Sequence, residues 1–488
     1  MKKTLLIASV FSVTGIFAQA PTPVKYVEYD LPNGLHVILH EEHATPIVAV
    51  SVMYHVGSKN ESANRTGFAH FFEHLLFEGS TNISRGEYST LVEKNGGALN
   101  ANTSQDRTYY YEILPSNQLE LGLWLESERL LHAKVDNTGV ETQREVVKEE
   151  KRQRVDNQPY ASFMTEMFKR AYKTHPYNWV PIGSMEDLDA AQEIDYVNFY
   201  RTFYVPSNAV LSIAGDLNID QTKKWIDKYF ASIPAGEAIN LFRDFENLSD
   251  ADFNTKYGVA KSSFDAKNFN NPKDGKAKEV LKKYSAMANK IPRPNPAFEP
   301  LNGVSRDTIY DNIQLPAVFM GYKFPKETDP DFAAIEMMNE ILSGSNSSRM
   351  NKNIVEKKQQ AMAAFSFAFN MEDPGLGIVA AIAAGETSLA DLEKSLNEEI
   401  ENIQNGLISD EEFQKVRNQF ENRIVSSNSS VAGIAENLAQ NRMYFGNTEL
   451  INKQLEIYQK VTKEDIQRVA KKYFTPNNKI ILYYVPKK

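Results

Sequence analysis

Two histidines and a glutamate lie together in the run HFFEH at residues 70–74. The surrounding run 66–79 contains no proline and is dense in apolar residues, which predicts a helix with Gly79 just after its last turn. His70 and His74 are one helical turn apart and share a face, and Glu73 projects between them. Two neutral imidazoles so placed can hold two corners of a tetrahedral zinc site. The carboxylate beside them can accept a proton from an attacking water molecule.

This spacing matches the inverted zinc-peptidase signature H-x-x-E-H. Histidine occurs only 8 times in 488 residues, so chance produces the motif in about one such chain in a hundred. The alternative interpretation is a pair of histidines on a half-buried helix, each bonded to a backbone carbonyl. A third ligand elsewhere in the chain would decide between the two.

A zinc site that keeps one position open for water needs a third protein ligand. The segment 140–152 predicts a charged helix whose inward side is marked by Val146 and Val147. At 100° per residue, Glu150 projects between these valines, whereas Glu149 projects roughly 90° or more away. We therefore predict that Glu150 is the third ligand and that Glu149 is solvated. The alternative for any glutamate in this segment is an ordinary exposed helix charge.

These residues resemble peptidase family M16, the family of pitrilysin and insulin-degrading enzyme, and within it the short-chain branch of the mitochondrial processing peptidase. The resemblance rests on HFFEH at 70–74 and REVVKEE at 144–150. It implies one Zn²⁺ per chain, bound by His70, His74 and Glu150, with Glu73 as the general base. The chain departs at Gln143, where many members carry a glutamate. A neutral amide there can still form a hydrogen bond behind the ligands, but it would tune the metal less strongly.

In family M16, each unit is a sheet backed by helices, and four units form a clamshell around a chamber. A chain with two units would be half of that clamshell. The strand that holds Asn100 and Ala101 is similar to the family's edge strand, which pairs with the substrate backbone. The resemblance therefore implies extended or unfolded peptides as substrates. The alternative for Asn100 is a turn residue that follows Gly96 and Gly97.

Family active sites normally receive an arginine and a tyrosine from a second-half unit, and these stabilise the oxyanion and hold the substrate. Alignment of residues 347–350 with the family pattern places these two roles at Val355 and Met362. Neither side chain can donate a hydrogen bond. The resemblance therefore leads us to predict a heterodimer, in which a zinc-less M16-like subunit supplies the arginine and tyrosine. A homodimer is the alternative.

The chain also contains an internal repeat. Asp195 and Pro206 recur 270 positions later as Asp465 and Pro476 in a similar setting. The sequence PIVAV at 46–50 likewise corresponds to PAVFM at 316–320, again 270 positions later. The repeat predicts an α+β fold with two homologous sheet-plus-helices units. The alternative is two unrelated helix–proline–strand corners. In the second unit, the positions of His70, Glu73 and His74 are taken by Ile335, Met338 and Asn339.

We therefore divide the chain into four parts. Residues 1–20 are a signal peptide, 21–236 the zinc-bearing unit, 237–300 a proline-rich linker with an insertion that contains one helix at 276–288, and 301–488 a metal-free unit. Within the zinc-bearing unit, paired strands are expected at 26–41 and 46–56, and further strands at 98–114 and 209–214. Helices are expected at 86–94, 118–131 and 140–154.

The N-terminus reads MKK, then an apolar run to residue 18 and the small-residue sequence AQA. This pattern predicts a cleaved signal peptide, with a membrane anchor as the alternative. No later stretch is apolar enough to span a bilayer, so we expect an exported, periplasmic protein. A net charge of −9 argues against nucleic-acid binding. The absence of cysteine excludes disulfides and cysteine-protease chemistry.

Together these patterns predict an exported zinc-dependent endopeptidase that hydrolyses unfolded peptides or short polypeptides in an enclosed chamber, with Glu73 as the base. One alternative is a non-catalytic or partner-dependent subunit of an M16-like heterodimer. The other is a zinc hydrolase that acts on substrates other than peptides.

Overall fold

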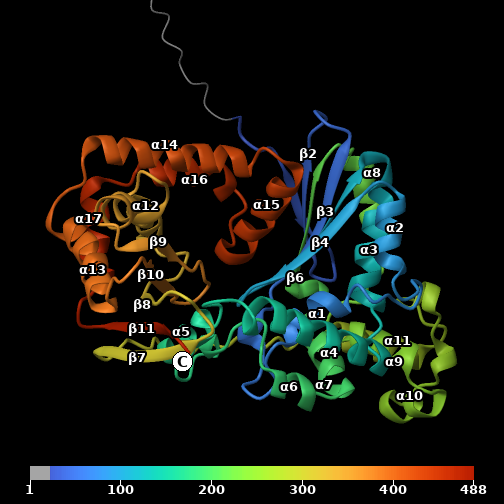
Figure 1. Ribbon diagram of the computed structural model, residues 1–488. Coiled ribbons are helices and arrows are strands. Elements are labelled where there is room, and N and C mark those ends of the chain that lie inside the picture. The colour runs from blue at the N-terminus through green and yellow to red at the C-terminus, as the bar shows by residue number, and fades with distance from the viewer. Residues whose placement is uncertain (1–21, 488) are drawn as a thin grey trace, which may run out of the picture.

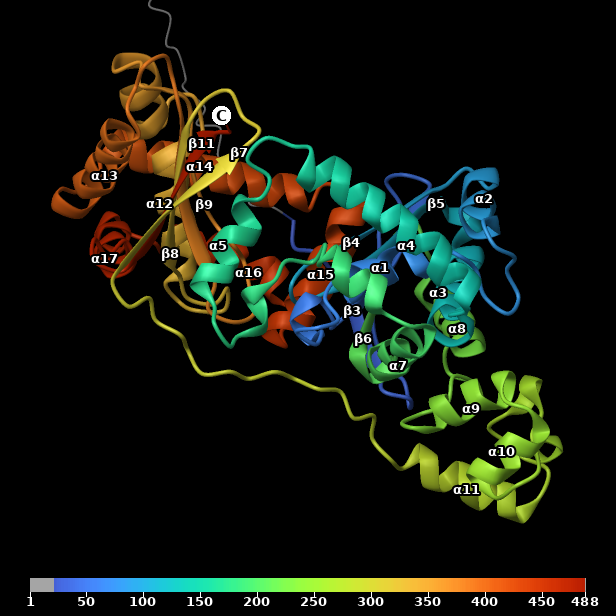
Figure 2. The same ribbon diagram turned by 60° about the horizontal axis from the view of Figure 1, so that its bottom comes forward.

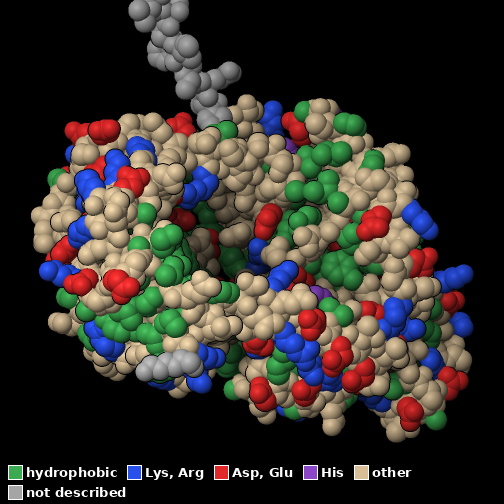
Figure 3. Space-filling view, viewed as in Figure 1, with side chains coloured by type: hydrophobic (Ala, Val, Ile, Leu, Met, Phe, Trp, Pro, Cys, Tyr) green, Lys and Arg blue, Asp and Glu red, His purple; other side chains and the backbone are tan. Residues whose placement is uncertain are grey.

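The structure is a computed structural model that describes residues 22–487. The predicted signal peptide at 1–20 lies outside these residues. Two sheet-plus-helices units stand side by side with a hollow between them (Figures 1 and 3). Within the described part of the chain, no helix is both long and apolar enough to cross a bilayer.

The first unit is built on a six-stranded sheet of order β1-β2-β6-β3-β5-β4, in which β2 and β6 are parallel. Its strands are β1 (Val27–Asp30), β2 (His36–Glu41), β3 (Ile47–Tyr54), β4 (Ala98–Thr103), β5 (Thr108–Pro115) and β6 (Ala209–Gly215). Its helices are α1 (Phe68–Leu75), α2 (Glu87–Lys94), α3 (Leu119–His132), α4 (Asn137–Lys151), α5 (Phe163–Ala171), α6 (Met185–Ala190), α7 (Glu193–Phe203) and α8 (Ile219–Tyr229).

The second unit repeats this plan on a five-stranded sheet of order β7-β11-β8-β10-β9. Its strands are β7 (Val304–Asp311), β8 (Ala317–Lys323), β9 (Ala361–Ala368), β10 (Leu376–Ala383) and β11 (Lys479–Pro486). Its helices are α12 (Phe332–Ser343), α13 (Leu389–Asn405), α14 (Asp410–Ser427), α15 (Val431–Phe445), α16 (Leu450–Gln459) and α17 (Lys463–Tyr473).

The two sheets correspond strand for strand, with β2, β6, β3, β5 and β4 matching β7, β11, β8, β10 and β9. The pair β7 and β11 is parallel, as β2 and β6 are. Strands β3 and β8 begin 270 residues apart, and so do β6 and β11 and also α7 and α17. The structure thus confirms the predicted α+β class and the repeat of one unit.

Each sheet has one face covered by helices of its own unit and the other face covered by a helix of the opposite unit. Helix α15 packs against β6 and β3 of the first sheet, in a core shared by Leu438 and Val210. Helix α5 packs against β11 and β8 of the second sheet, where Phe168 and Phe319 share a core. Figure 1 shows α15 beside the first sheet and α5 beneath the second. The two units are therefore interlocked.

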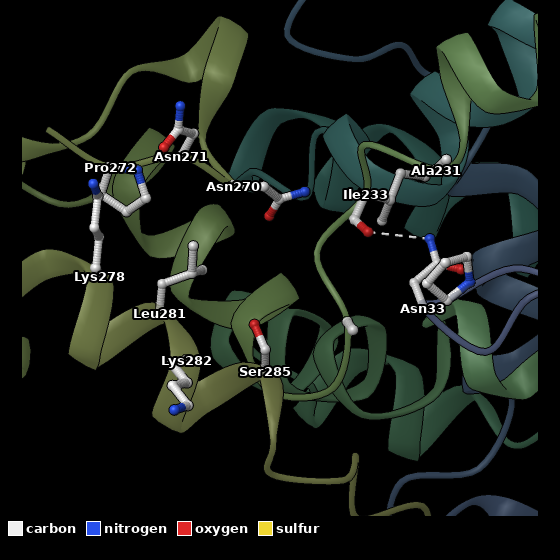
Figure 4. A pocket seen from close by; sticks show the side chains of 12 residues that line it. Asn33, Ala231, Ile233, Asn270, Asn271, Pro272, Lys278, Leu281, Lys282 and Ser285 are labelled. Atoms are coloured by element: carbon white, nitrogen blue, oxygen red, sulfur yellow. Dashed lines mark hydrogen bonds between the residues drawn. The ribbon is translucent and has the colours of Figure 1, made fainter.

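The insertion between the units contains three helices instead of the single helix expected at 276–288: α9 (Ala238–Asn247), α10 (Asp250–Tyr257) and α11 (Gly275–Ser285). Aromatic contacts join them: Phe245 of α9 packs against Phe253 of α10, and Tyr257 of α10 packs against Tyr284 of α11. A cavity of about 540 Å³ lies where the insertion meets the turn of the first unit. There Asn33 Nδ2 donates to the carbonyl oxygen of Ile233 at 3.1 Å (Figure 4).

Residues 288–302, which we call the strap, run from the insertion to β7 without regular secondary structure (Figure 2). Arg293 donates to the carbonyl oxygen of His55 at 2.5 Å. Farther along, the Glu299 carboxylate accepts the backbone N–H groups of Lys173, Thr174 and His175 at 2.6–2.8 Å. The strap is therefore fixed to the first unit at both positions.

Two details of the predicted strands were wrong. Strands β2 and β3 do not pair, because β6 lies between them and is bonded to both. Every residue of β6 is buried, as expected of a central strand. The expected strand at 98–114 is a hairpin of β4 and β5, which turns where Ser104 Oγ accepts the N–H groups of Asp106 and Arg107.

Candidate metal centre

Helix α1 carries the HFFEH motif and is held at its N-terminus by Glu61. This buried carboxylate accepts the backbone N–H groups of Gly67 at 2.9 Å and Ala69 at 2.8 Å, which would otherwise lack helical partners. Burial raises the pKa of Glu61 to about 8. The helix ends at Leu75, earlier than predicted. Gly79 instead occupies a turn with φ +129°, where a side chain would collide with the carbonyl oxygen of Ile83.

Two further contacts fix the middle and the end of α1. Tyr110 Oη donates to the carbonyl oxygen of Phe72 at 2.8 Å, and Arg129 Nη1 donates to that of Leu76 at 3.2 Å. The Arg129 side chain is fully buried, and its charge is balanced by Glu126 and Glu112. Its guanidinium also stacks on the rings of Phe77, Tyr88 and Tyr110. The backbone that carries the motif is therefore rigidly placed.

The structure brings His70, His74 and Glu150 together. His74 Nε2 lies 3.0 Å and His70 Nε2 3.4 Å from Glu150 Oε2, and the two ring nitrogens are 3.4 Å apart. A tetrahedral zinc site with bonds of about 2.0–2.1 Å separates neighbouring ligand atoms by about 3.3–3.4 Å. All three atoms offer a lone pair when each imidazole is neutral and carries its proton on Nδ1. The three side chains can thus hold one metal ion.

Glu150 and Glu149 point to different sides of α4. Glu150 contacts both histidines, whose neighbouring rings hold its pKa far below the usual range, and its other oxygen lies 2.8 Å from Arg154 Nη1. Glu149 is exposed and pairs with Arg152. The valine pair used in the prediction is only half right, because Val147 is buried whereas Val146 is 44% exposed. Directly after Glu150, α4 passes into a π-helical turn at Arg152–Asp156, a feature frequent at functional sites.

Glu73 is half-buried and is held by Thr103, whose Oγ1 donates to Glu73 Oε2 at 2.7 Å. Thr103 is the last residue of β4, the outermost strand of the first sheet. Neither Thr103 nor Glu61 was predicted from the sequence to support the site. No periodic pattern marks either one, because both act on α1 from outside the helix: Glu61 from the preceding loop and Thr103 from β4.

Asn100 and Ala101 lie within β4, so Asn100 is a strand residue and not a turn residue. In the described sheet, β4 pairs with β5 on one side only. Asn100 Oδ1 accepts the N–H of Ala101 at 2.9 Å. The hairpin thus places a free strand edge next to the residue that holds Glu73.

Gln143 lies on α4 about two helical turns before Glu150. Its side-chain amide donates to Glu78, which is paired with Arg85 at 2.6 Å. The second ring nitrogen of His70, Nδ1, is buried without a hydrogen-bond partner in the described structure. The structure therefore shows no protein group that fixes the tautomer of that ring.

The matching region of the second unit is apolar. Ile335 and Met338 of α12 are fully buried, and Asn339 Nδ2 bonds the carbonyl oxygen of Ile335 at 3.0 Å. Val355 packs against the core of this unit, and Met362 of β9 is 64% exposed.

Two family models match the chain. Residues 36–183 match the insulinase model of peptidase family M16, and residues 195–420 match the peptidase M16 inactive domain. The chain is 29% identical to the zinc protease PqqE of Helicobacter pylori over 100% of this chain and 99% of that protein.

Among solved structures, the chain is similar to a protease from Helicobacter pylori with a TM-score of 0.80 and 25% identity, covering 95% of this chain and 100% of that chain. It is also similar to the periplasmic protease PqqL from Escherichia coli, with a TM-score of 0.68 and 17% identity. That match covers 96% of this chain but 48% of PqqL, so the two-unit fold corresponds to about half of the longer protein.

Proposed function

Because the chain belongs to peptidase family M16, we propose that it is a zinc-dependent endopeptidase whose metal ion is bound by His70, His74 and Glu150. The observation that carries this proposal is the convergence of three lone-pair atoms at 3.0–3.4 Å, the spacing of a tetrahedral site. The name of the related zinc protease PqqE supports the same metal and the same class of reaction.

Zinc in such a site acts as a Lewis acid that polarises a carbonyl and makes water a competent nucleophile near neutral pH. Glu73 accepts the proton of the attacking water and delivers it to the leaving amine. Thr103 keeps the Glu73 carboxylate in place through its hydroxyl hydrogen bond. Glu61, Tyr110 and Arg129 hold α1 so that the histidines need no rearrangement before binding.

We propose that the free edge of β4 at Asn100 and Ala101 binds the backbone of an extended peptide by strand addition. This mode uses main-chain hydrogen bonds, so it favours unfolded peptides or short polypeptides over folded proteins. Because Thr103 on the same strand contacts Glu73, a peptide added to this edge would lie beside the base.

We further propose that the chain is exported by its N-terminal leader and closes an enclosed chamber with a second M16-like subunit. This chain matches the fold of about half of PqqL, which supports an assembly in which a second subunit provides the other half. Val355 packs against the core, and neither Val355 nor Met362 has a polar side-chain group that could stabilise an oxyanion. A zinc-less partner that contributes an arginine and a tyrosine would supply this function. The same observation favours the second candidate function, a subunit that is active only with its partner.

The metal site is tested by comparing Glu150→Gln with the matched control Glu149→Gln. Both change one carboxylate on α4, but only Glu150 faces the histidines. We expect the purified wild type and E149Q to contain about one zinc per chain by mass spectrometry, and E150Q to lose it. A chelator should abolish cleavage of a fluorogenic unfolded peptide by the wild type. Equal zinc in E149Q and E150Q would overturn the proposed ligand set.

The partner is tested by assaying the purified chain alone and mixed with the M16-like product of a neighbouring gene. We expect the mixture to cleave the peptide much faster than either protein alone, while the zinc content of this chain stays the same. Turnover by the chain alone that matches the mixture would overturn the heterodimer and leave the homodimer.

A further inference from the structure

A cavity of about 450 Å³ lies where the strap crosses the second unit. Phe298 and Leu301 of the strap line it together with Phe324 and Tyr473 of the second unit. Lys323, the last residue of β8, also lines the cavity. Mostly apolar walls with a few charged groups are typical of small-molecule sites.

The ammonium group of Lys323 has no carboxylate within ion-pair distance in the described residues; its Nζ lies 3.2 Å from the centroid of the Tyr172 ring. Lys59, a buried lysine at another contact between the two units, is different. Lys59 pairs with Asp106 at 2.9 Å and with Glu372 at 2.5 Å. Burial without such a partner lowers the pKa of Lys323 to about 7. Burying a charge without a counter-ion is costly.

The acidic groups near the cavity are already engaged. Glu299, whose negative charge acts on Lys323, accepts three backbone N–H groups of residues 173–175. Asp329 accepts the N–H of Asp331 at 2.9 Å, and Lys472 is paired with Asp331 at 2.7 Å. Lys326 is exposed at the rim. The cavity thus offers a cation at its wall and apolar surface around it.

We propose that this cavity binds a small carboxylate with an apolar body, and that Lys323 is its counter-ion. The anionic group would supply the charge that Lys323 lacks, and the apolar body would pack between the strap and the second unit. A free organic acid and the C-terminal residue of a peptide both have this chemistry. The site shares no residue with the proposed metal centre and extends beyond the proposed peptidase activity.

Binding is tested by calorimetric titration of the full chain with N-acetylphenylalanine and with its amide. We expect the acid to bind at least about tenfold more tightly than the amide, because only the acid can pair with Lys323. Binding near pH 7.5 should also take up protons, since an anion raises the pKa of Lys323. Titrations in two buffers with different ionisation enthalpies measure this uptake. Equal affinity for acid and amide, or no binding of either at millimolar concentration, would overturn the proposal.

Two variants locate the site. Lys323→Met should weaken binding of the acid at least about tenfold, whereas Lys326→Met, at the rim, should change it by less than about threefold. Thermal unfolding and zinc content show whether each variant is folded. Unchanged affinity in folded K323M would overturn the proposal. A peptide with a free C-terminal phenylalanine separates the two sources: binding identifies a site for peptide termini, and failure identifies a site for free acids.

Discussion

The α1–β4 region of the first unit and the α12–β9 region of the second have the same topology and different chemistry. In the first, two imidazoles and a carboxylate lie on a helix face beside a free strand edge. In the second, Ile335 and Met338, which the sequence alignment places at the positions of His70 and Glu73, are buried. Both units therefore have the helix and strand arrangement that the site needs, and a few side chains decide which of the two can bind a metal.

The largest expected effect concerns Glu73, which the second unit replaces with Met338. Glu73→Gln should lower kcat by about 10²–10⁴-fold, because the amide cannot accept the proton of the attacking water. Zinc content should stay at the wild-type level. Steady-state cleavage of an unfolded peptide measures the effect, with Glu93→Gln on the exposed face of α2 as control. Full activity in E73Q would show that Glu73 is not the general base.

The reverse exchange tests the second unit. Met338→Glu places an unpaired carboxylate in a closed core and should cost about 3–5 kcal/mol of unfolding free energy. The control Met362→Glu adds the same group at an exposed position of β9, and should change stability by no more than about 0.5 kcal/mol. Urea unfolding measures both. Equal stability of the two variants would show that the core of the second unit tolerates a carboxylate at position 338.

Glu61, at the start of α1, should make the stability of the first unit depend on pH. Its pKa is about 8 in the fold against 4.5 in the unfolded chain, so the folded state binds its proton more tightly. Its contribution to the free energy of unfolding is therefore complete below about pH 4.5 and is lost as the pH rises through about 8. At about 1.4 kcal/mol per pKa unit, the total loss is a few kcal/mol. Glu61→Gln cannot ionise, and should lose less stability between pH 5 and pH 8 than the wild type. Unfolding free energies at both pH values test this, with the exposed Glu186→Gln as control; parallel pH profiles for E61Q and the wild type would contradict it.

The smallest expected effect is at Thr103. Thr103→Val keeps the shape of the side chain but removes the hydroxyl that holds Glu73. A hydrogen bond to a charged group is worth about 1.5–3 kcal/mol, so kcat/KM should fall about tenfold or more. Thr255→Val on the exposed face of α10 is the control. Unchanged kcat/KM in T103V would show that the base needs no support from β4.

Much of the fold could be predicted because it follows from local spacing. The repeat was visible in the sequence, since Asp195 and Pro206 recur at a fixed distance. The common face of His70 and His74 follows from helix geometry alone. Projection also selects Glu150 over Glu149, although Val146, one of the two valines used, is exposed.

The remaining features depend on contacts that no periodic sequence pattern marks. Glu61 and Thr103 reach α1 from a loop and from a strand, and neither has a periodic pattern that points to α1. The placement of β6 between β2 and β3 depends on pairing across more than half of the first unit. Similarly, the apolar faces of α5 and α15 indicate burial, but not that the surface that buries them belongs to the opposite unit.

Because α5 and α15 each pack on the sheet of the opposite unit, the two units should stay together after proteolysis between them. A protease that nicked the strap would separate α5 from α15 in sequence but not in space, because each would remain clamped against the other fragment's sheet. The two pieces should co-purify after such a cut. Neither piece expressed by itself should be soluble, since each would present a bare sheet face to water.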